Sequence, residues 1–109
     1  MVEIRIDYQG DLRCEATHGP SGSTITTDAP VDNHGKGEAF SPTDLVGTAL
    51  GSCILTTMAI VAKNKFSRDL PAATATVIKE MAASPSRRIG ALKLVISVSG
   101  IFSEQEKAA

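Results

Sequence analysis

Residues 41–64, SPTDLVGTALGSCILTTMAIVAKN, decide how the rest of this chain must fold. Ser41 suits the N-cap of a helix, Pro42 suits the first helical position, and Asp44 stands where the acid of a capping box lies. No further proline or charge follows until Lys63, and the apolar residues in between cover nearly every face. Such a pattern predicts a long helix over residues 41–64 that is buried on all sides.

Cys53 is the residue of this helix that could carry chemistry. Only a thiolate is nucleophilic, so an apolar surrounding leaves a thiol inert unless a cation or hydrogen-bond donor reaches it. The alternative is that Cys53 is a small core residue, because free cysteines are among the most buried residues in proteins. Gly51, in the middle of the same helix, predicts a close approach of another element, since a helical glycine otherwise costs about 1 kcal/mol relative to alanine.

The composition of the 109 residues indicates one soluble domain over residues 1–109. A net charge of -1 argues against nucleic acid and anionic membranes as partners, and the absence of tryptophan argues against stacking on bases. Gly, Ser, Thr and Asp interrupt the long helix, so a core helix is favoured over a membrane span. Charges at Glu3, Arg5 and Asp7 argue against a signal peptide, and two cysteines make no disulfide framework, so we expect a cytoplasmic location.

Strand patterns lie on both sides of the helix. Alternating residues predict strands over residues 2–8 and 12–17, joined by a turn at residues 9–11, and a third strand over residues 23–27. Beyond the helix, strands at residues 72–81 and 89–100 form a hairpin around residues 84–88, whose two arginines, Arg87 and Arg88, are expected to face solvent. The fold class is therefore α+β, with antiparallel sheets packed on a central helix.

The loop over residues 28–40, DAPVDNHGKGEAF, leads directly into the helix. Loops in this position often carry function, although a solvated polar loop is the simpler interpretation. A metal site made by His18, His34 and an aspartate would lack any recognised ligand spacing, so no metal is expected.

At the other end of the chain, residues 103–106 form a capping box one turn before the last residue, which predicts that a C-terminal helix, and a strand after it, are missing.

The stretch DAPVDNHGKGEAFSPTDLVGTALGSC, followed by a long apolar helix and an alternating hairpin, resembles the OsmC/Ohr family of osmotically inducible and organic hydroperoxide resistance proteins. The Ser-Pro-x-x-Leu helix start is similar to one branch of that family. The resemblance implies an intertwined homodimer, in which the two central helices pack beneath sheets built by strands of both subunits. It also implies a thiol peroxidase that reduces organic hydroperoxides without a cofactor, with Cys53 as the first redox cysteine.

The resemblance implies a second, resolving cysteine in a Cys-Pro motif on a C-terminal helix, and a dithiol reductant that reopens the disulfide. That region is absent here, and Cys14, expected to be a packed strand residue, does not match it. The peroxidase branches carry a glutamate where this chain has Thr43, and an arginine in the loop where Lys36 is the single cation. Lys36 and Glu38 are therefore the tentative activators of Cys53.

Two functions remain open on the sequence. The first is a thiol-dependent peroxidase that acts through Cys53 on organic hydroperoxides. The second is a non-catalytic dimeric module that binds a small lipophilic ligand, with Cys53 as a packed residue.

Overall fold

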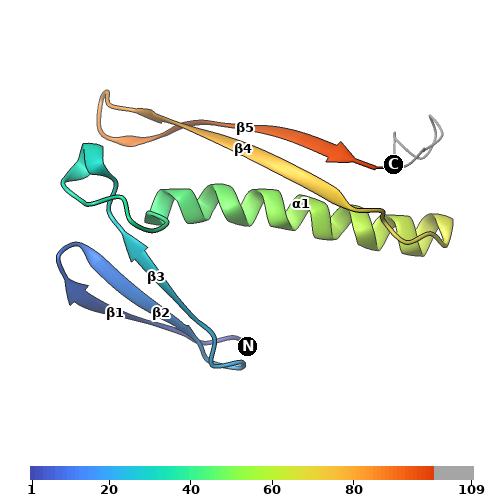
Figure 1. Cartoon of the computed structure of the whole chain (residues 1–109), viewed down its shortest axis with the longest axis horizontal. Helices are drawn as coiled ribbons and strands as arrows, with labels where there is room; N and C mark the ends of the chain where they lie inside the picture. The colour runs from blue at the N-terminus through green and yellow to red at the C-terminus, as the bar shows by residue number, and fades with distance from the viewer. Residues whose placement is uncertain (100–109) are drawn as a thin grey trace. The chain divides into compact units, whose positions relative to one another are not determined.

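The computed structural model describes residues 1–99, which divide into a first unit, Met1–Leu45, and a second unit from residue 46 on (Figure 1). The elements follow in the order β1 (Ile4–Gly10), β2 (Arg13–His18), β3 (Thr24–Asp28), the short 3-10 helix η1 (Val31–Asn33), α1 (Pro42–Phe66), β4 (Ala73–Ala82) and β5 (Arg88–Val98). The α+β class and the antiparallel strands predicted from the sequence are confirmed. The predicted capping box at residues 103–106 lies outside the described residues.

The first unit contains a three-stranded antiparallel sheet in the order β1–β2–β3. Its first turn is the two-residue loop Asp11–Leu12, in which both residues have positive φ, as a tight hairpin between right-twisted strands requires. The turn was expected at residues 9–11, so β1 and β2 are displaced by one to two residues from their predicted limits. The displacement arises because pairing continues to Gly10, where the register shifts.

Helix α1 begins as the sequence predicts. The Asp44 N–H donates to Ser41 Oγ at 3.1 Å, and the Ser41 N–H donates to Asp44 Oδ2 at 3.0 Å. This reciprocal capping box satisfies donors that a helix start otherwise leaves without partners. The helix runs two residues beyond its predicted end, to Phe66, and Ser67, which follows it, has the left-handed conformation that often ends a helix.

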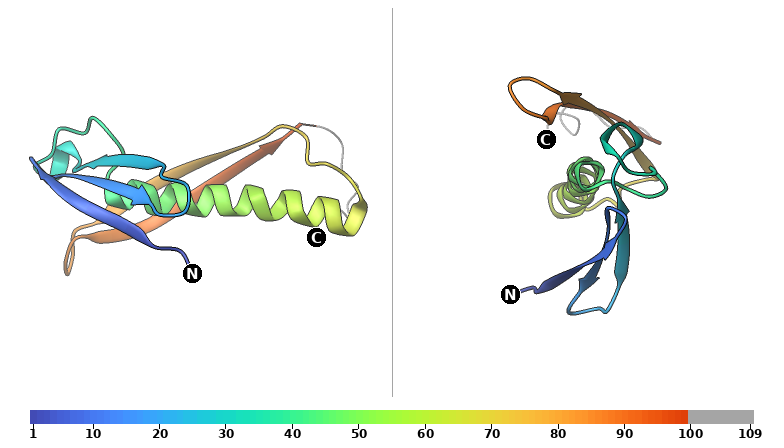
Figure 2. Two further views of the ribbon diagram at one scale, coloured as in Figure 1. Left: turned by 90° about the horizontal axis from the view of Figure 1, so that it is seen from below. Right: turned by 90° about the vertical axis from the view of Figure 1, so that its left-hand side faces the viewer.

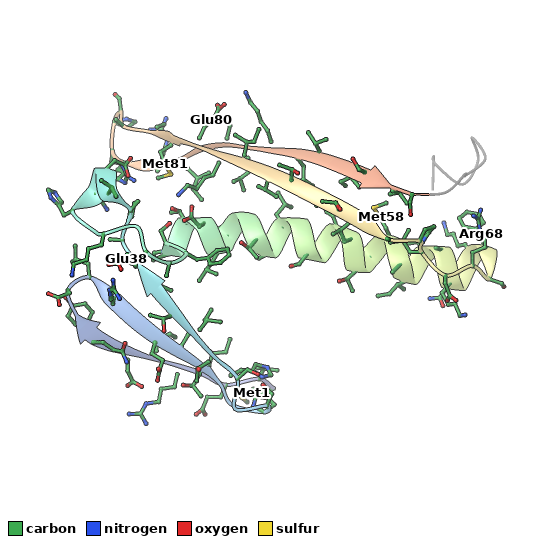
Figure 3. The ribbon with its side chains drawn as sticks, in the orientation of Figure 1. Met1, Glu38, Met58, Arg68, Glu80 and Met81 are labelled. Atoms are coloured by element: carbon green, nitrogen blue, oxygen red, sulfur yellow. The ribbon has the colours of Figure 1, made fainter. Side chains whose placement is uncertain are left out.

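One face of α1 packs against the β4–β5 hairpin, which runs beside the helix in Figure 1 and crosses it obliquely in the left-hand view of Figure 2. A Cβ added to Gly51 would lie 3.1 Å from Val77 Cγ2, and one added to Gly47 would lie 3.2 Å from Val77 Cγ1. The close approach predicted at Gly51 is thus confirmed. Met58 points from the helix toward the hairpin, whereas Glu80 projects from the opposite face of the strands (Figure 3).

The predicted burial of α1 on all sides is not found within one chain. Its buried residues are Gly47, Gly51 and Ala62, on the face that the hairpin covers, while Val46 and Ile60 are 51% and 54% exposed. A two-stranded hairpin is too narrow to cover an entire helix circumference.

By length and composition α1 could also cross a membrane, with a mean hydropathy of 1.9 over its most apolar window, but core helices of soluble proteins meet the same criterion.

Candidate functional site

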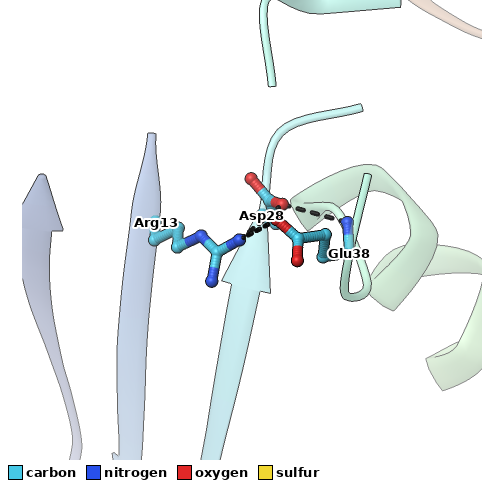
Figure 4. A network of polar contacts seen from close by, with 3 residues as sticks. All are labelled: Arg13, Asp28 and Glu38. Atoms are coloured by element: carbon cyan, nitrogen blue, oxygen red, sulfur yellow. Dashed lines mark hydrogen bonds and ion pairs between the residues drawn. The ribbon is translucent and has the colours of Figure 1, made fainter. Parts of the chain in front are cut away.

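A network of three charged side chains lies in the first unit (Figure 4). Arg13 at the start of β2 places one guanidinium nitrogen, Nη2, 2.6 Å from Glu38 Oε1 and 3.4 Å from Asp28 Oδ2. The same Asp28 oxygen accepts a hydrogen bond from the backbone N–H of Glu38 at 3.0 Å. We call Arg13, Asp28 and Glu38 the Arg13 network. Through this network, the side chains of Arg13 on β2 and Asp28 on β3 bind the side chain and the backbone N–H of Glu38, in the loop before α1.

Asp28 is the buried member of the Arg13 network. Its side chain is 0% exposed, against 32% for Arg13 and 60% for Glu38. The hydrogen bond from the Glu38 N–H is the main reason that the pKa of the Asp28 carboxyl is below its ordinary value. Burial raises this pKa, whereas the positive charge of Arg13, the backbone of Lys36 and the charge of Lys36 lower it further. Asp28 is therefore a buried carboxylate rather than a neutral acid, and its second oxygen, Oδ1, is buried without a hydrogen-bond partner.

Backbone contacts fold the loop between β3 and α1 around this carboxylate. The Asp28 N–H donates to the Phe40 carbonyl at 3.0 Å, and the Gly37 N–H donates to the Ala29 carbonyl at 3.1 Å. Gly35 passes so close to the Ala29 carbonyl that a Cβ at Gly35 would overlap its oxygen, and Gly37 has a φ of +64°. The two glycines beside Lys36 are thus explained by backbone approach and backbone conformation.

Cys53 belongs to the second unit, where it is exposed on α1. It lies on a stripe of residues spaced alternately four and three apart, away from the glycines that meet the hairpin. This α1 stripe consists of Val46, Leu50, Cys53, Thr57 and Ile60, and all five side chains are exposed. The interpretation of Cys53 as a residue packed in the core is therefore wrong for the single chain, because the hairpin covers a different face.

Sequence reasoning found part of the Arg13 network and missed part of it. Glu38 was singled out and lies in the network, and Lys36 is near enough for its charge to act on Asp28. Arg13 was missed as a site residue, because alternation along a strand gives only the face of a side chain and not its partner. Asp28 was assigned to a solvated loop, but it is the last residue of β3 and is buried.

The other candidates have local structural roles. His18 Nδ1 lies 2.6 Å from Ser21 Oγ in the turn after β2, and no cluster of three or more potential ligands for a metal occurs within residues 1–99. Cys14 is half-buried on β2, paired with Tyr8 and Thr27 of the neighbouring strands, as expected of a packed strand residue.

Comparison with known proteins identifies the relatives of this chain. No protein-family model and no curated protein matches it. Among solved structures, a candidate osmotic stress induced and detoxification response protein from Psychrobacter arcticus is 45% identical, with a TM-score of 0.90 over 99% of this chain and 77% of the other. The chain belongs to the OsmC family.

A second solved structure, an organic hydroperoxide resistance protein OsmC from Legionella pneumophila, has the same fold. Its TM-score is 0.76 at 17% identity, again over 99% of this chain and 77% of that one. That protein is also described as a predicted redox protein and regulator of sulfide bond formation. At this identity the likeness shows the shared fold alone.

Proposed function

We propose that this OsmC-family protein is a thiol-dependent peroxidase that reduces organic hydroperoxides through Cys53. The observation that carries the proposal is the exposure of the Cys53 thiol on α1, in a chain of the OsmC family. A peroxidatic sulfur must be reached by its substrate, and a thiol packed in a core could not be. The apolar residues beside Cys53 on the α1 stripe favour a hydrophobic hydroperoxide over hydrogen peroxide.

The proposed reaction is a nucleophilic displacement at oxygen. The Cys53 thiolate attacks the terminal oxygen of the hydroperoxide, the O–O bond breaks, and the released alkoxide takes a proton and leaves as an alcohol. The sulfur is oxidised to a sulfenic acid as the hydroperoxide is reduced. A dithiol reductant then returns the sulfenic acid to the thiol, by way of a mixed disulfide, with release of water. No metal, flavin or haem takes part in this sequence.

Activation of the thiol requires a cation and a partner that holds it in place. Lys36 and Glu38 stay our proposed activators. The Glu38 carboxylate is itself bound by the Arg13 guanidinium at 2.6 Å, and the rigid fork of donors on an arginine suits it to hold a carboxylate.

We also propose that the protein acts as a homodimer, with Val46, Leu50 and Ile60 of the α1 stripe in the subunit interface and Cys53 near its border, where a substrate can still reach the thiol. The spacing of four and three residues along the stripe is that of the seam between two packed helices. Further exposed apolar side chains, Ile4, Ile6 and Tyr8, follow one face of β1. Sedimentation at micromolar concentration should show a dimer, and replacement of Leu50 by glutamate should shift it toward monomer. A stable wild-type monomer would contradict this assembly.

The peroxidase proposal is tested by substitution of the two cysteines. After one equivalent of cumene hydroperoxide, mass spectrometry should show oxygen added at Cys53, and Cys53→Ser should abolish hydroperoxide consumption. Cys14→Ser is the matched control and should leave the first turnover intact, because Cys14 lies on β2 away from α1 in the chain. Rapid formation of a Cys14–Cys53 disulfide would overturn this assignment of roles.

The second candidate function is a dimeric module that binds a small lipophilic ligand. The observation in its favour is the exposed apolar character of the α1 stripe. A Cys53 that resists both alkylation and hydroperoxide, in a protein that nevertheless binds a fluorescent fatty acid, would favour this function over the peroxidase.

A further inference from the structure

We infer that the hydroxyl groups of Thr56 and Thr57, one turn after Cys53 on α1, donate hydrogen bonds to the Cys53 thiolate and favour its formation. The inference rests on the proposed function and adds two residues to the same site. All three residues belong to one helix and to the second unit, so the geometry of that helix determines how they lie relative to one another.

The helix places both threonines beside Cys53. Residues three and four apart are neighbours on a helix surface, with about 5–6 Å between their Cβ atoms. Helical side chains also lean toward the N-terminus, so Thr56 and Thr57 extend over the turn that carries Cys53. All three side chains are exposed, on the side of α1 that the hairpin leaves open. Rotation of either threonine side chain can therefore direct its hydroxyl at the sulfur.

The two hydroxyl groups are not committed to other partners. A serine or threonine within a helix often donates its hydroxyl to a carbonyl three or four residues earlier. Ser52 does so, with its Oγ 3.3 Å from the Ala49 carbonyl oxygen. Among residues 1–99, neither the Thr56 nor the Thr57 hydroxyl makes such a bond. Both therefore keep a donor that is available to an anion on the neighbouring turn.

A thiolate at Cys53 has little other support from its own helix. Cys53 lies near the middle of α1, beyond the first turn within which the helix dipole acts. The nearest charged residues of the helix, Asp44 and Lys63, are about 13–15 Å away along its axis. Hydrogen bonds to the charged form of an acid favour that form, and they are stronger than hydrogen bonds between neutral groups. The two hydroxyl groups are thus the nearest groups on α1 that can favour the thiolate.

The test removes the hydroxyl groups and keeps the shape of the side chains. In the double variant Thr56→Val and Thr57→Val, iodoacetamide should alkylate Cys53 about threefold to tenfold more slowly at neutral pH, because less of the thiol is ionised. The difference should vanish at high pH, where the thiolate forms without these donors. Replacement of both threonines by serine keeps the donors and should leave the rate near that of the wild type. Ser52→Ala removes a hydroxyl that is bound to Ala49, so this matched control should also react normally.

The outcomes separate the inference from the proposed function. If the double valine variant is alkylated as fast as the wild type, or if its rate stays low at high pH, the hydroxyl groups do not act on the thiolate and the inference is overturned. The peroxidase proposal survives that result if cumene hydroperoxide still oxidises wild-type Cys53. Slow alkylation of the valine variant, with no oxidation of wild-type Cys53, would uphold the hydrogen bonds and refute the peroxidase. All rates are compared at a protein concentration at which sedimentation shows the same assembly for each variant.

Discussion

Substitution of Gly51 tests the packing of α1 against the hairpin. A Cβ at this position would lie 3.1 Å from Val77 Cγ2 and 3.7 Å from Ala75 Cβ, so the first added atom already forces Val77 to move by a few tenths of an ångström. In Gly51→Leu three more carbons enter the same space, and overpacking of this kind costs about 1–3 kcal/mol. The better helix propensity of leucine returns about 1 kcal/mol. We expect the difference, a net loss of about 0–2 kcal/mol, in the free energy of unfolding.

The assay is urea denaturation followed by circular dichroism at a fixed protein concentration, since the stability of an oligomer depends on concentration. Val77→Ala supplies the control, because it removes the methyl groups that a side chain at Gly51 would meet. Gly51→Ala should stabilise the Val77→Ala variant by about 1 kcal/mol, and the wild type by less. If Gly51→Leu makes the wild type more stable, or if the effects of Gly51→Ala and Val77→Ala simply add, the two residues are not in contact and the reasoning is wrong.

Three further outcomes follow from the first unit. The pKa of the Asp28 carboxyl is lowered in the folded state, so the ionised group stabilises the fold fully at pH values above its ordinary pKa of 3.8. This stabilisation is lost as the pH falls through the pKa of the folded state. Measured against pH in acid, the free energy of unfolding should show the loss in the wild type but not in Asp28→Asn. Ser41→Ala should cost about 1 kcal/mol in urea denaturation, because it removes the acceptor of the Asp44 N–H at 3.1 Å; no loss would mean that the cap is not formed in solution. Leu12→Gly should raise the thermal midpoint, with a gain of up to about 1 kcal/mol, because Leu12 has a φ of +61° and its side chain is exposed; a lowered midpoint would show that the leucine side chain packs on something.

The local elements of this protein are specified by its sequence. The Ser41–Asp44 capping box, the long helix that follows it, and the alternation of the β4–β5 hairpin all arise from neighbours a few residues apart, and each is found in the structure. The free-energy cost of a glycine inside a helix correctly indicated that another element lies close to Gly51, although the sequence could not show that the neighbouring residue is Val77. Element ends were less accurate, since a turn such as Asp11–Leu12 depends on how far the strands continue to pair.

The site depends on contacts between residues far apart in the chain, and these only the tertiary structure decides. Arg13 and Glu38 are brought together because β2 pairs with β3, whose last residue, Asp28, anchors the returning loop. No periodicity relates residues 13, 28 and 38, so no pattern in the sequence could have joined them. The exposure of Cys53 has the same origin: apolar residues surround α1 on every side, and only the position of the hairpin decides which face is covered and which is left open.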